Sequence, residues 1–302
     1  MNNLTLKQLR YLVALDQHQN FGRAAESCAV TQPALSIQIK ALEASLGAPL
    51  VERTSREIHM TSFGENVVER AKDILRAVDE LDDLARLSKG PLSGRLRLGV
   101  IPTIAPYLLP EILKTLSAGF PMLDVFPRET ITETLLKDLT SYQLDVAIMA
   151  LPVSEPMLQE LALFDEQFVL VRHIHESHAP VPSPDQLQKM RLLLLEEGHC
   201  FRDQALSFCN AEGTKTRDVM EGSSLTTLVR MVGAGLGMTL IPEMAVPFET
   251  KSENVSVTKF PAPAPSRTIG MVWRKTNPLA PQLFELAAAI REIALQDFDP
   301  PA

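Results

Sequence analysis

The sequence is poor in cysteine and tryptophan, with three and one in 302 residues, and it has no apolar run of about 18 residues that could cross a membrane. Its first residues lack the basic, apolar and small-residue pattern of a secretory signal peptide. We therefore expect a cytoplasmic protein in which Cys28, Cys200 and Cys209 are reduced at rest. With 22% charged and 45% hydrophobic residues, the chain has the composition of a globular protein, and its length predicts about two domains.

An excess of positive charge is also missing, because the net charge of the whole chain is −8. Residues 1–64 carry six Lys or Arg against five Asp or Glu, a net charge of +1, and the rest carries 23 against 32, a net charge of −9. A near-neutral head on an acidic body permits DNA binding by the head alone.

The head has the pattern of a winged helix-turn-helix. Thr5 and Gln8 predict a capping box at the start of a first helix, and Asn20 is a plausible cap for a second. In that second helix Cys28 falls on the apolar stripe, so we expect it to be a buried thiol. Thr31 can cap a third helix.

The third predicted helix ends at Gly47 and buries a stripe of Leu and Ile side chains. Its opposite face carries Gln32, Ser36 and Lys40, which is how a recognition helix is presented to the major groove. Gln pairs with adenine and Ser bonds to several base edges. A solvated helix face is the alternative.

Two short strands, 50–53 and 58–61, are predicted to form a wing that places basic residues against phosphates. The run 21–53 closely resembles the DNA-binding domain of LysR-type transcriptional regulators, with their Ala-Ala pair, Gln-Pro-Ala-Leu-Ser helix start and Glu-Arg wing. The resemblance implies that DNA bases or backbone are approached by Thr31, Gln32, Pro33, Ala34, Ser36 and Lys40 in the helix, and by Arg53, Thr54, Ser55 and Arg56 in the wing.

From Thr61 to about Leu87 the sequence has no proline, and its apolar residues are spaced alternately four and three apart. This is the a/d seam of a coiled coil, and its members are Val67, Ala71, Ile74, Val78, Leu81 and Ala85. We expect two copies to associate along this seam, so that paired heads read half-sites about 34–36 Å apart. The alternative is one amphipathic helix packed on its own domain. A hinge follows at 88–94.

The body alternates strand and helix patterns, which predicts an α/β fold with a mostly parallel sheet covered on both faces. LysR-type effector domains resemble type II periplasmic binding proteins, with two lobes and a cleft. On this resemblance we expect a DNA-binding domain at 1–60, a linker and dimerisation helix at 61–88, and a redox-sensing regulatory domain at 89–302, with lobe I at 92–164 and 267–302 and lobe II at 165–266.

Cys200 and Cys209 lie at the two ends of a segment predicted to be helical from 200 to about 211. At the helix N-terminus the dipole, with flanking His199 and Arg202, would favour the Cys200 thiolate, the species that attacks peroxide. Nine helical residues separate the thiols by roughly 13–14 Å, whereas a disulfide needs Cα atoms within about 7 Å. A disulfide would therefore require unwinding of the helix, and peroxide would drive a conformational switch.

Other interpretations of these residues remain open on spacing alone. Cys200 and Cys209 could be two unrelated core cysteines, and a zinc site fits less well because their spacing differs from that of structural zinc ligands. His173, His175 and His178 admit a metal site, but a polar loop at a strand end is favoured. We expect no metal and no cofactor.

The residues around these cysteines resemble the peroxide-sensing OxyR branch of the LysR family, and the resemblance extends along nearly the whole chain. The matching runs are Gly-His-Cys-Phe-Arg-Asp-Gln-Ala…Phe-Cys at 198–209, Ile-Pro-Thr at 101–103, Pro-Tyr-Leu-Leu-Pro at 106–110 and Arg-Thr-Ile-Gly at 267–270. The resemblance implies that Cys200 reacts with peroxide and that Cys209 is its disulfide partner. It also implies that peroxide is bound or activated by Thr103, Thr132, His199, Arg202, Asp203 and Arg267.

The favoured interpretation is a hydrogen peroxide-responsive transcription factor, mainly an activator of oxidative-stress defence genes, and not an enzyme. The resemblance implies a dimer or tetramer, contact with RNA polymerase, and resetting by cellular thiol reductants. The alternative keeps the DNA-binding head but makes the cleft a site for a small organic acid, with the cysteines as bystanders. A thiol peroxidase is disfavoured by the head, and a secreted solute-binding protein by the missing signal.

Overall fold

The computed structural model describes residues 4–53, 58–87, 93–209, 220–251 and 254–298. By internal contacts the chain divides into two compact units, Met1–Ala85 and Arg86–Ala302. None of the helices in the described ranges is long and apolar enough to cross a membrane.

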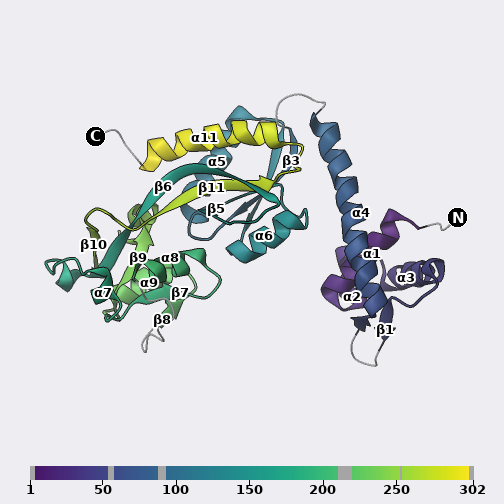
Figure 1. The fold of residues 1–302 in the computed structure, drawn as a ribbon, viewed down its shortest axis with the longest axis horizontal. Helices are drawn as coiled ribbons and strands as arrows, with labels where there is room; N and C mark the ends of the chain where they lie inside the picture. The colour runs from purple at the N-terminus through teal and green to yellow at the C-terminus, as the bar shows by residue number, and fades with distance from the viewer. Residues whose placement is uncertain (1–3, 54–57, 88–92, 210–219, 252–253, 299–302) are drawn as a thin grey trace. The chain divides into compact units, whose positions relative to one another are not determined.

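The first unit is a helical head with a two-stranded wing (Figure 1). It contains α1 (Leu6–His18), α2 (Phe21–Ser27), α3 (Gln32–Leu46), β1 (Val51–Arg53), β2 (Ile58–Met60) and α4 (Ser62–Leu87). β1 and β2 pair antiparallel. The tip of the predicted wing, with Thr54, Ser55 and Arg56, lies outside the described residues, as does the side chain of Arg53.

The local signals for the helix ends in the head are confirmed. Thr5 and Gln8 form the capping box, and the Asn20 side chain accepts hydrogen bonds from two backbone amides of α2. Thr31 occupies the N-cap of α3 without a side-chain hydrogen bond, and Gly47 ends this helix at φ 75°. Cys28 is only half buried, because it lies at the C-cap of α2 and packs against the edge of the core.

α4 starts tightly against the wing. The Thr61 hydroxyl accepts a hydrogen bond of 2.8 Å from the Gly64 amide, and a Cβ at Gly64 would lie 2.1 Å from the Leu50 carbonyl oxygen. A larger residue at position 64 would therefore push α4 away from Leu50, which directly precedes β1.

The apolar seam of α4 is divided in its surroundings. Near the start of the helix, Val67 packs on the core of the head and Ala71 is buried, as the single-helix alternative would have it. Farther along, Ile74 is 43% exposed and Leu81 is 63% exposed, and the side chain of Ala85 lies outside the described residues. In the second half of the seam one chain therefore leaves Ile74 and Leu81 exposed, while Val78 is half buried.

The second unit is built on a seven-stranded sheet in the order β10-β6-β11-β5-β3-β4, with β9 also pairing with β6. Its strands are β3 (Gly94–Val100), β4 (Leu123–Glu129), β5 (Val146–Leu151), β6 (Leu158–His173), β9 (Thr239–Pro242), β10 (Val255–Lys259) and β11 (Ser266–Arg274). A small parallel sheet joins β7 (Leu193–Leu195) and β8 (Met220–Gly222). The helices are α5 (Ala105–Gly119), α6 (Thr132–Thr140), α7 (Pro184–Leu187), α8 (Cys200–Phe208), α9 (Leu225–Gly233), α10 (Val246–Glu249) and α11 (Ala280–Phe298).

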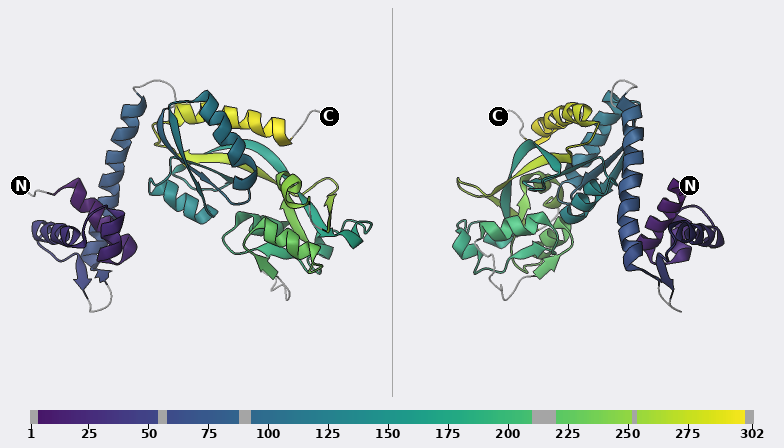
Figure 2. Two further views of the ribbon diagram at one scale, coloured as in Figure 1. Left: turned by 180° about the vertical axis from the view of Figure 1, so that it is seen from behind. Right: turned by 45° about the vertical axis from the view of Figure 1, so that its right-hand side comes forward.

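The prediction of a mostly parallel sheet is wrong. In the large sheet only the pairs that β3 makes with β4 and β5 are parallel, whereas β6 and β11 pair antiparallel with every strand that they contact. Alternation of strands and helices predicts parallel crossovers, but here β6 and β11 run as long neighbours through the unit (Figure 1). α5 and α11 lie side by side on one face of the sheet (Figure 2).

β6 links two separate hydrophobic cores. The first core comes from residues between 96 and 163 and between 269 and 293, and the second comes from residues between 168 and 260 together with Tyr107. The sequence predicts only 168–171 of this strand, because acidic and polar residues interrupt its first half. That half pairs with β11 and still contributes Leu158 and Leu163 to the first core.

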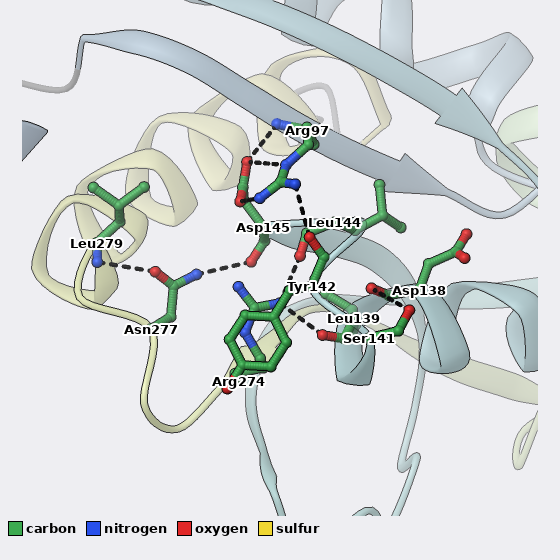
Figure 3. A network of polar contacts seen from close by, with 10 residues as sticks. All are labelled: Arg97, Asp138, Leu139, Ser141, Tyr142, Leu144, Asp145, Arg274, Asn277 and Leu279. Carbon is green, nitrogen blue, oxygen red and sulfur yellow. Dashed lines mark hydrogen bonds and ion pairs between the residues drawn. The ribbon is translucent and has the colours of Figure 1, made fainter. Parts of the chain in front are cut away.

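Buried charges fix one end of the first core (Figure 3). Asp145 is fully buried, and its carboxylate accepts hydrogen bonds from the backbone and guanidinium of Arg97 at 2.7 Å. Arg274 donates to two carbonyl oxygens at the end of α6 and before β5, and Asn277 donates to the Asp145 carbonyl. Buried charges that are paired and hydrogen-bonded in this way avoid the cost of desolvation, so this network holds α6, β3 and β11 together.

Candidate functional site

α8 carries one cysteine at each end. Cys200 is its first residue and is half buried, while Cys209 follows the last turn and is fully buried. Both are free thiols. Helix geometry separates them by roughly 13–14 Å, so the reduced fold keeps them beyond disulfide distance. The prediction of a helix between the two cysteines is confirmed, although 210 and 211 lie outside the described residues.

Cys200 faces a small pocket between α8, the N-terminus of α6 and the turn after β3. The pocket is lined by Ile101, Pro102, Thr103, Ile131, Thr132, His199, Cys200 and Phe201. It is a narrow crevice with no room for a water molecule in this conformation. A small molecule therefore reaches the thiol only when the surrounding side chains move.

The backbone before α8 brings the thiol to this pocket. Gly198 has φ +94°, a left-handed conformation that L side chains rarely adopt, and a Cβ there would lie 2.9 Å from the Ile131 side chain. Glycine thus lets the turn press against the residue before α6. Sequence reasoning missed Ile131 and Pro102 as lining residues, because their roles arise from contact between distant segments.

Thr132 supplies an unusual polar atom to the pocket. Its hydroxyl oxygen is buried and has no hydrogen-bond partner among the described residues. Buried polar groups are nearly always paired, and an exception calls for an explanation such as an absent ligand or a chemical role. The hydroxyl is available to a small polar molecule that enters beside Cys200.

Thr103 is held by a buried ion pair. Arg267 donates from Nη1 to the Thr103 hydroxyl at 2.8 Å and from Nη2 to the Thr103 carbonyl at 3.2 Å. Glu166 pairs with the same guanidinium at 2.8 Å and also accepts from the Met244 amide. Because the Thr103 oxygen accepts from Arg267, its own proton is left to donate. Sequence reasoning missed Glu166, which pairs with Arg267 only through the register of β6 and β11.

The charged residues that the sequence predicts beside the Cys200 thiol do not supply charge to the pocket in the structure. Arg202 donates to the Leu195 carbonyl at 2.8 Å and pairs with Glu221 at 2.7 Å, and Asp203 is exposed, so neither lines the pocket. Burial lowers the pKa of His199, which lines the pocket as a neutral imidazole at pH 7. The positive end of the α8 dipole and the hydroxyl groups of Thr103 and Thr132 are therefore the groups that can stabilise a negative charge in this pocket.

Cys209 and the aromatic residues of α8 anchor the helix in the second core. Phe201 packs edge-on against Phe168 with ring centroids 4.8 Å apart, and Phe208 packs against Phe260 at 5.1 Å. Burial raises the pKa of the Cys209 thiol to about 11, so the thiol is protonated at neutral pH. In the reduced fold Cys209 is thus both remote from Cys200 and a weak nucleophile.

Most of the predicted DNA-facing residues at the start of α3 are exposed in the head. Thr31, Gln32, Pro33, Ala34 and Lys40 are exposed, and Ser36 is half buried. Leu35, Ile39 and Leu42 point the other way into the core of the head. The exposed face is therefore free to enter a groove, and its contacts with DNA stay a prediction.

The three histidines predicted as a loop lie around a short 3-10 turn, Ile174–Glu176. The rings of His173 and His175 are 4.8 Å apart, and the His175 amide donates to the His173 ring. Over the described ranges no group of three or more His, Cys, Asp or Glu is placed to hold a metal ion.

Comparison with known proteins finds two matching families. Residues 6–65 match the bacterial regulatory helix-turn-helix protein, lysR family, and residues 89–294 match the LysR substrate binding domain. The chain is 43% identical over 293 residues to the Escherichia coli K12 DNA-binding transcriptional dual regulator OxyR, covering 95% of each. It is 42% identical to the hydrogen peroxide-inducible genes activator of Dickeya chrysanthemi, covering 96% of this chain and 95% of the relative.

Solved structures give the same likeness. A full-length OxyR variant from Pseudomonas aeruginosa matches with a TM-score of 0.74 and 37% identity, covering 96% of this chain and 95% of that one. A Corynebacterium glutamicum OxyR mutant described as bound to H2O2 matches with a TM-score of 0.67 and 33% identity, covering 98% and 94%. These similarities extend over both units of the chain.

Proposed function

The chain belongs to the LysR family of bacterial regulators, among the hydrogen peroxide-inducible genes activators, and we propose that it regulates transcription through a reversible Cys200–Cys209 disulfide. The observation that carries this proposal is the pocket beside Cys200, with a buried hydroxyl of Thr132 that lacks a partner among the described residues. We assign DNA reading to 1–60, dimerisation to 61–88 and redox sensing to 89–302. Because it acts on the chromosome, the protein works in the cytoplasm.

The first chemical step is attack of the Cys200 thiolate on one oxygen of hydrogen peroxide. An S–O bond forms as the O–O bond breaks, giving sulfenic acid, and the leaving hydroxide takes up a proton to become water. In this step the hydroxyl groups of Thr103 and Thr132, which line the crevice, donate hydrogen bonds to peroxide or to the leaving oxygen. Arg267, fixed by Glu166, keeps Thr103 in position.

The second step joins the two sulfurs. Cys209 attacks the sulfenic sulfur, an S–S bond forms, and the hydroxyl group leaves with the Cys209 proton as a second water. Neither the distance nor the buried, protonated state of Cys209 permits this in the reduced fold. α8 therefore opens first, which brings the thiols together and exposes Cys209 to solvent, where it ionises more easily.

Signal transmission follows from the opened helix. The disulfide holds a rearranged second core, so reduced and oxidised regulatory domains pack differently between subunits. The exposed half of the α4 seam, including Ile74 and Leu81, joins two heads into a dimer, and regulatory domains extend this to a tetramer. Repacking then changes which half-sites are contacted, and so changes contact with RNA polymerase. Cellular thiols reduce the disulfide and restore α8.

A regulator of a small organic acid is the alternative function. The crevice beside Cys200 has no room for such a ligand in this structure, and the rival assigns no role to the thiols. A Cys200→Ser variant separates the two functions. We expect it to lose the transcriptional response to peroxide, whereas an unaltered response would favour the rival.

Peptide mass mapping tests the chemistry itself. The reduced full-length protein receives equimolar peroxide, remaining thiols are alkylated, and the peptides that contain Cys200 and Cys209 are identified. We expect a linked pair that is lost on reduction, with Cys28 alkylated throughout. Over-oxidised Cys200 with Cys209 left free would contradict the proposal.

A further inference from the structure

The recognition helix carries one large apolar side chain where polar residues are expected. Ile37 is 63% exposed, and within the described part of α3 it is the one large hydrophobic residue that is exposed. The helical period places it on the side opposite Leu35, Ile39 and Leu42, which are fully buried. It therefore lies near the centre of the outward face of α3.

The surroundings of Ile37 match those of a base-reading position. One turn before and after it, Pro33 and Ala41 are exposed and small, so the longer Ile37 side chain extends beyond them. Ala34 and Lys40, three residues before and after it, are exposed on the same outward side. A single exposed apolar residue is ordinary on a protein surface, but this one lies on the face that the proposed function places in the major groove.

We propose that Ile37 determines sequence specificity by packing against the C5-methyl group of a thymine. This inference rests on the proposed function of α3 as a recognition helix. In the major groove only thymine presents a methyl group, whereas cytosine lacks this methyl and adenine and guanine present polar edges. Polar base edges buried against Ile37 would lose water without gaining a hydrogen bond, and this loss disfavours the other bases.

The test removes the methyl group from the DNA and the side chain from the protein. Full-length wild-type protein, reduced and oxidised in separate runs, selects its preferred duplexes from a random pool. Each thymine of a selected duplex is then replaced singly by deoxyuridine, and binding is measured for wild type and Ile37→Ala. We expect one thymine per half-site at which deoxyuridine weakens wild-type binding about fourfold, the factor for burial of one methyl group.

The variants distinguish a methyl contact from a general loss of binding. Ile37→Ala should bind the selected duplex more weakly and show no further loss with deoxyuridine at that position. Lys40→Ala serves as the control, because the loss of a positive charge weakens binding to all probes alike and leaves the deoxyuridine effect intact. Circular dichroism should be unchanged, since Ile37 is exposed.

Two outcomes would overturn the assignment of Ile37 alone. Either deoxyuridine has no effect on wild type at any thymine, or it weakens wild type and Ile37→Ala by the same factor. If wild type enriches no duplex from the pool, the DNA-reading function itself fails, and this assignment fails with it.

Discussion

At the scale of single residues, the polar atoms around Cys200 decide how peroxide would be held in the proposed reaction. Thr132 keeps a buried hydroxyl that no described residue satisfies, and leaving such a group unpaired costs about 1–3 kcal/mol. Thr103, in contrast, accepts a hydrogen bond from Arg267 and so points its proton elsewhere. The fold thus keeps two hydroxyl donors beside Cys200 at some expense of stability.

Thr132→Val removes the hydroxyl and keeps the shape of the side chain. We expect the second-order rate of Cys200 oxidation by peroxide to fall roughly tenfold to a hundredfold, because a hydrogen bond to a charged group contributes about 1.5–3 kcal/mol. Stability should stay unchanged or rise, since an unpaired buried group is lost. Thr140→Val, at the other end of α6, is the matched control. A wild-type rate in Thr132→Val would show that this hydroxyl has no part in the reaction.

Cys209 gives the reduced protein a pH dependence at the alkaline end. Its pKa is raised to about 11 in the fold, so the unfolded chain releases this proton at lower pH than the folded chain. The contribution is therefore complete below about pH 8.5 and is lost as pH rises toward 11, by on the order of 2 kcal/mol. Urea unfolding of reduced wild type and Cys209→Ala, at pH 8 and at pH 10.5, measures the difference. Equal pH dependence in both proteins would contradict this effect of burial.

At the scale of elements, α8 is a short helix that the mechanism requires to open. Its aromatic anchors, Phe201 and Phe208, oppose opening, and its helical hydrogen bonds do so along the whole segment. Once Cys200 is oxidised, the free energy of opening controls how often Cys209 reaches it. At exposed positions of α8, a substitution that lowers helix propensity should therefore make the disulfide form faster.

Ser207 is an exposed position in the last turn of α8 and allows this test. Glycine there is less favourable in a helix than alanine by about 1 kcal/mol, so Ser207→Gly should form the disulfide about fivefold faster than Ser207→Ala. The preceding oxidation of Cys200 should be the same in both. Rapid mixing with peroxide, quenching by alkylation and mass analysis separate the two steps. Equal rates of disulfide formation would mean that closure does not depend on helix opening.

The helices and strands also show which parts of the fold the sequence alone could predict. Helix ends in the head were predictable, because caps such as Asn20 and Gly47 act through neighbours in the chain. The antiparallel pairing of β6 and β11 was not, since strand direction depends on contacts between distant segments. The same limit applies to Arg202, whose adjacency to Cys200 suggested a role at the thiol. Its guanidinium instead pairs with Glu221, which lies in β8.

At the scale of the whole molecule, the proposed signal passes from one thiol to two heads paired along α4. The α4 seam is half covered by its own domain and half exposed at Ile74 and Leu81. The heptad spacing was readable from the sequence, but the division was not, because it depends on how α4 meets the head. The exposed half is where a second copy is expected to bind.

Leu81→Lys tests this association. Burial of two copies of Leu81 in a dimer contributes about 3–6 kcal/mol, so the variant should weaken association along α4 at least a hundredfold. Sedimentation of the full-length reduced protein over a concentration range provides the measurement. Glu69→Lys, which places the same charge at an exposed position of α4, is the control and should associate as wild type does. A Leu81→Lys protein of unchanged mass would assign dimerisation to another surface.

The central claim, that the two cysteines join only when α8 opens, is tested most directly by hydrogen exchange. Backbone exchange of peptides covering 200–209 is measured by mass spectrometry in the reduced protein and after equimolar peroxide, with fragments of β6 and α11 as internal references. The account predicts slow exchange in the reduced form and loss of protection across 200–209 when the disulfide has formed. A linked Cys200–Cys209 pair in a segment that stays as protected as before would contradict it.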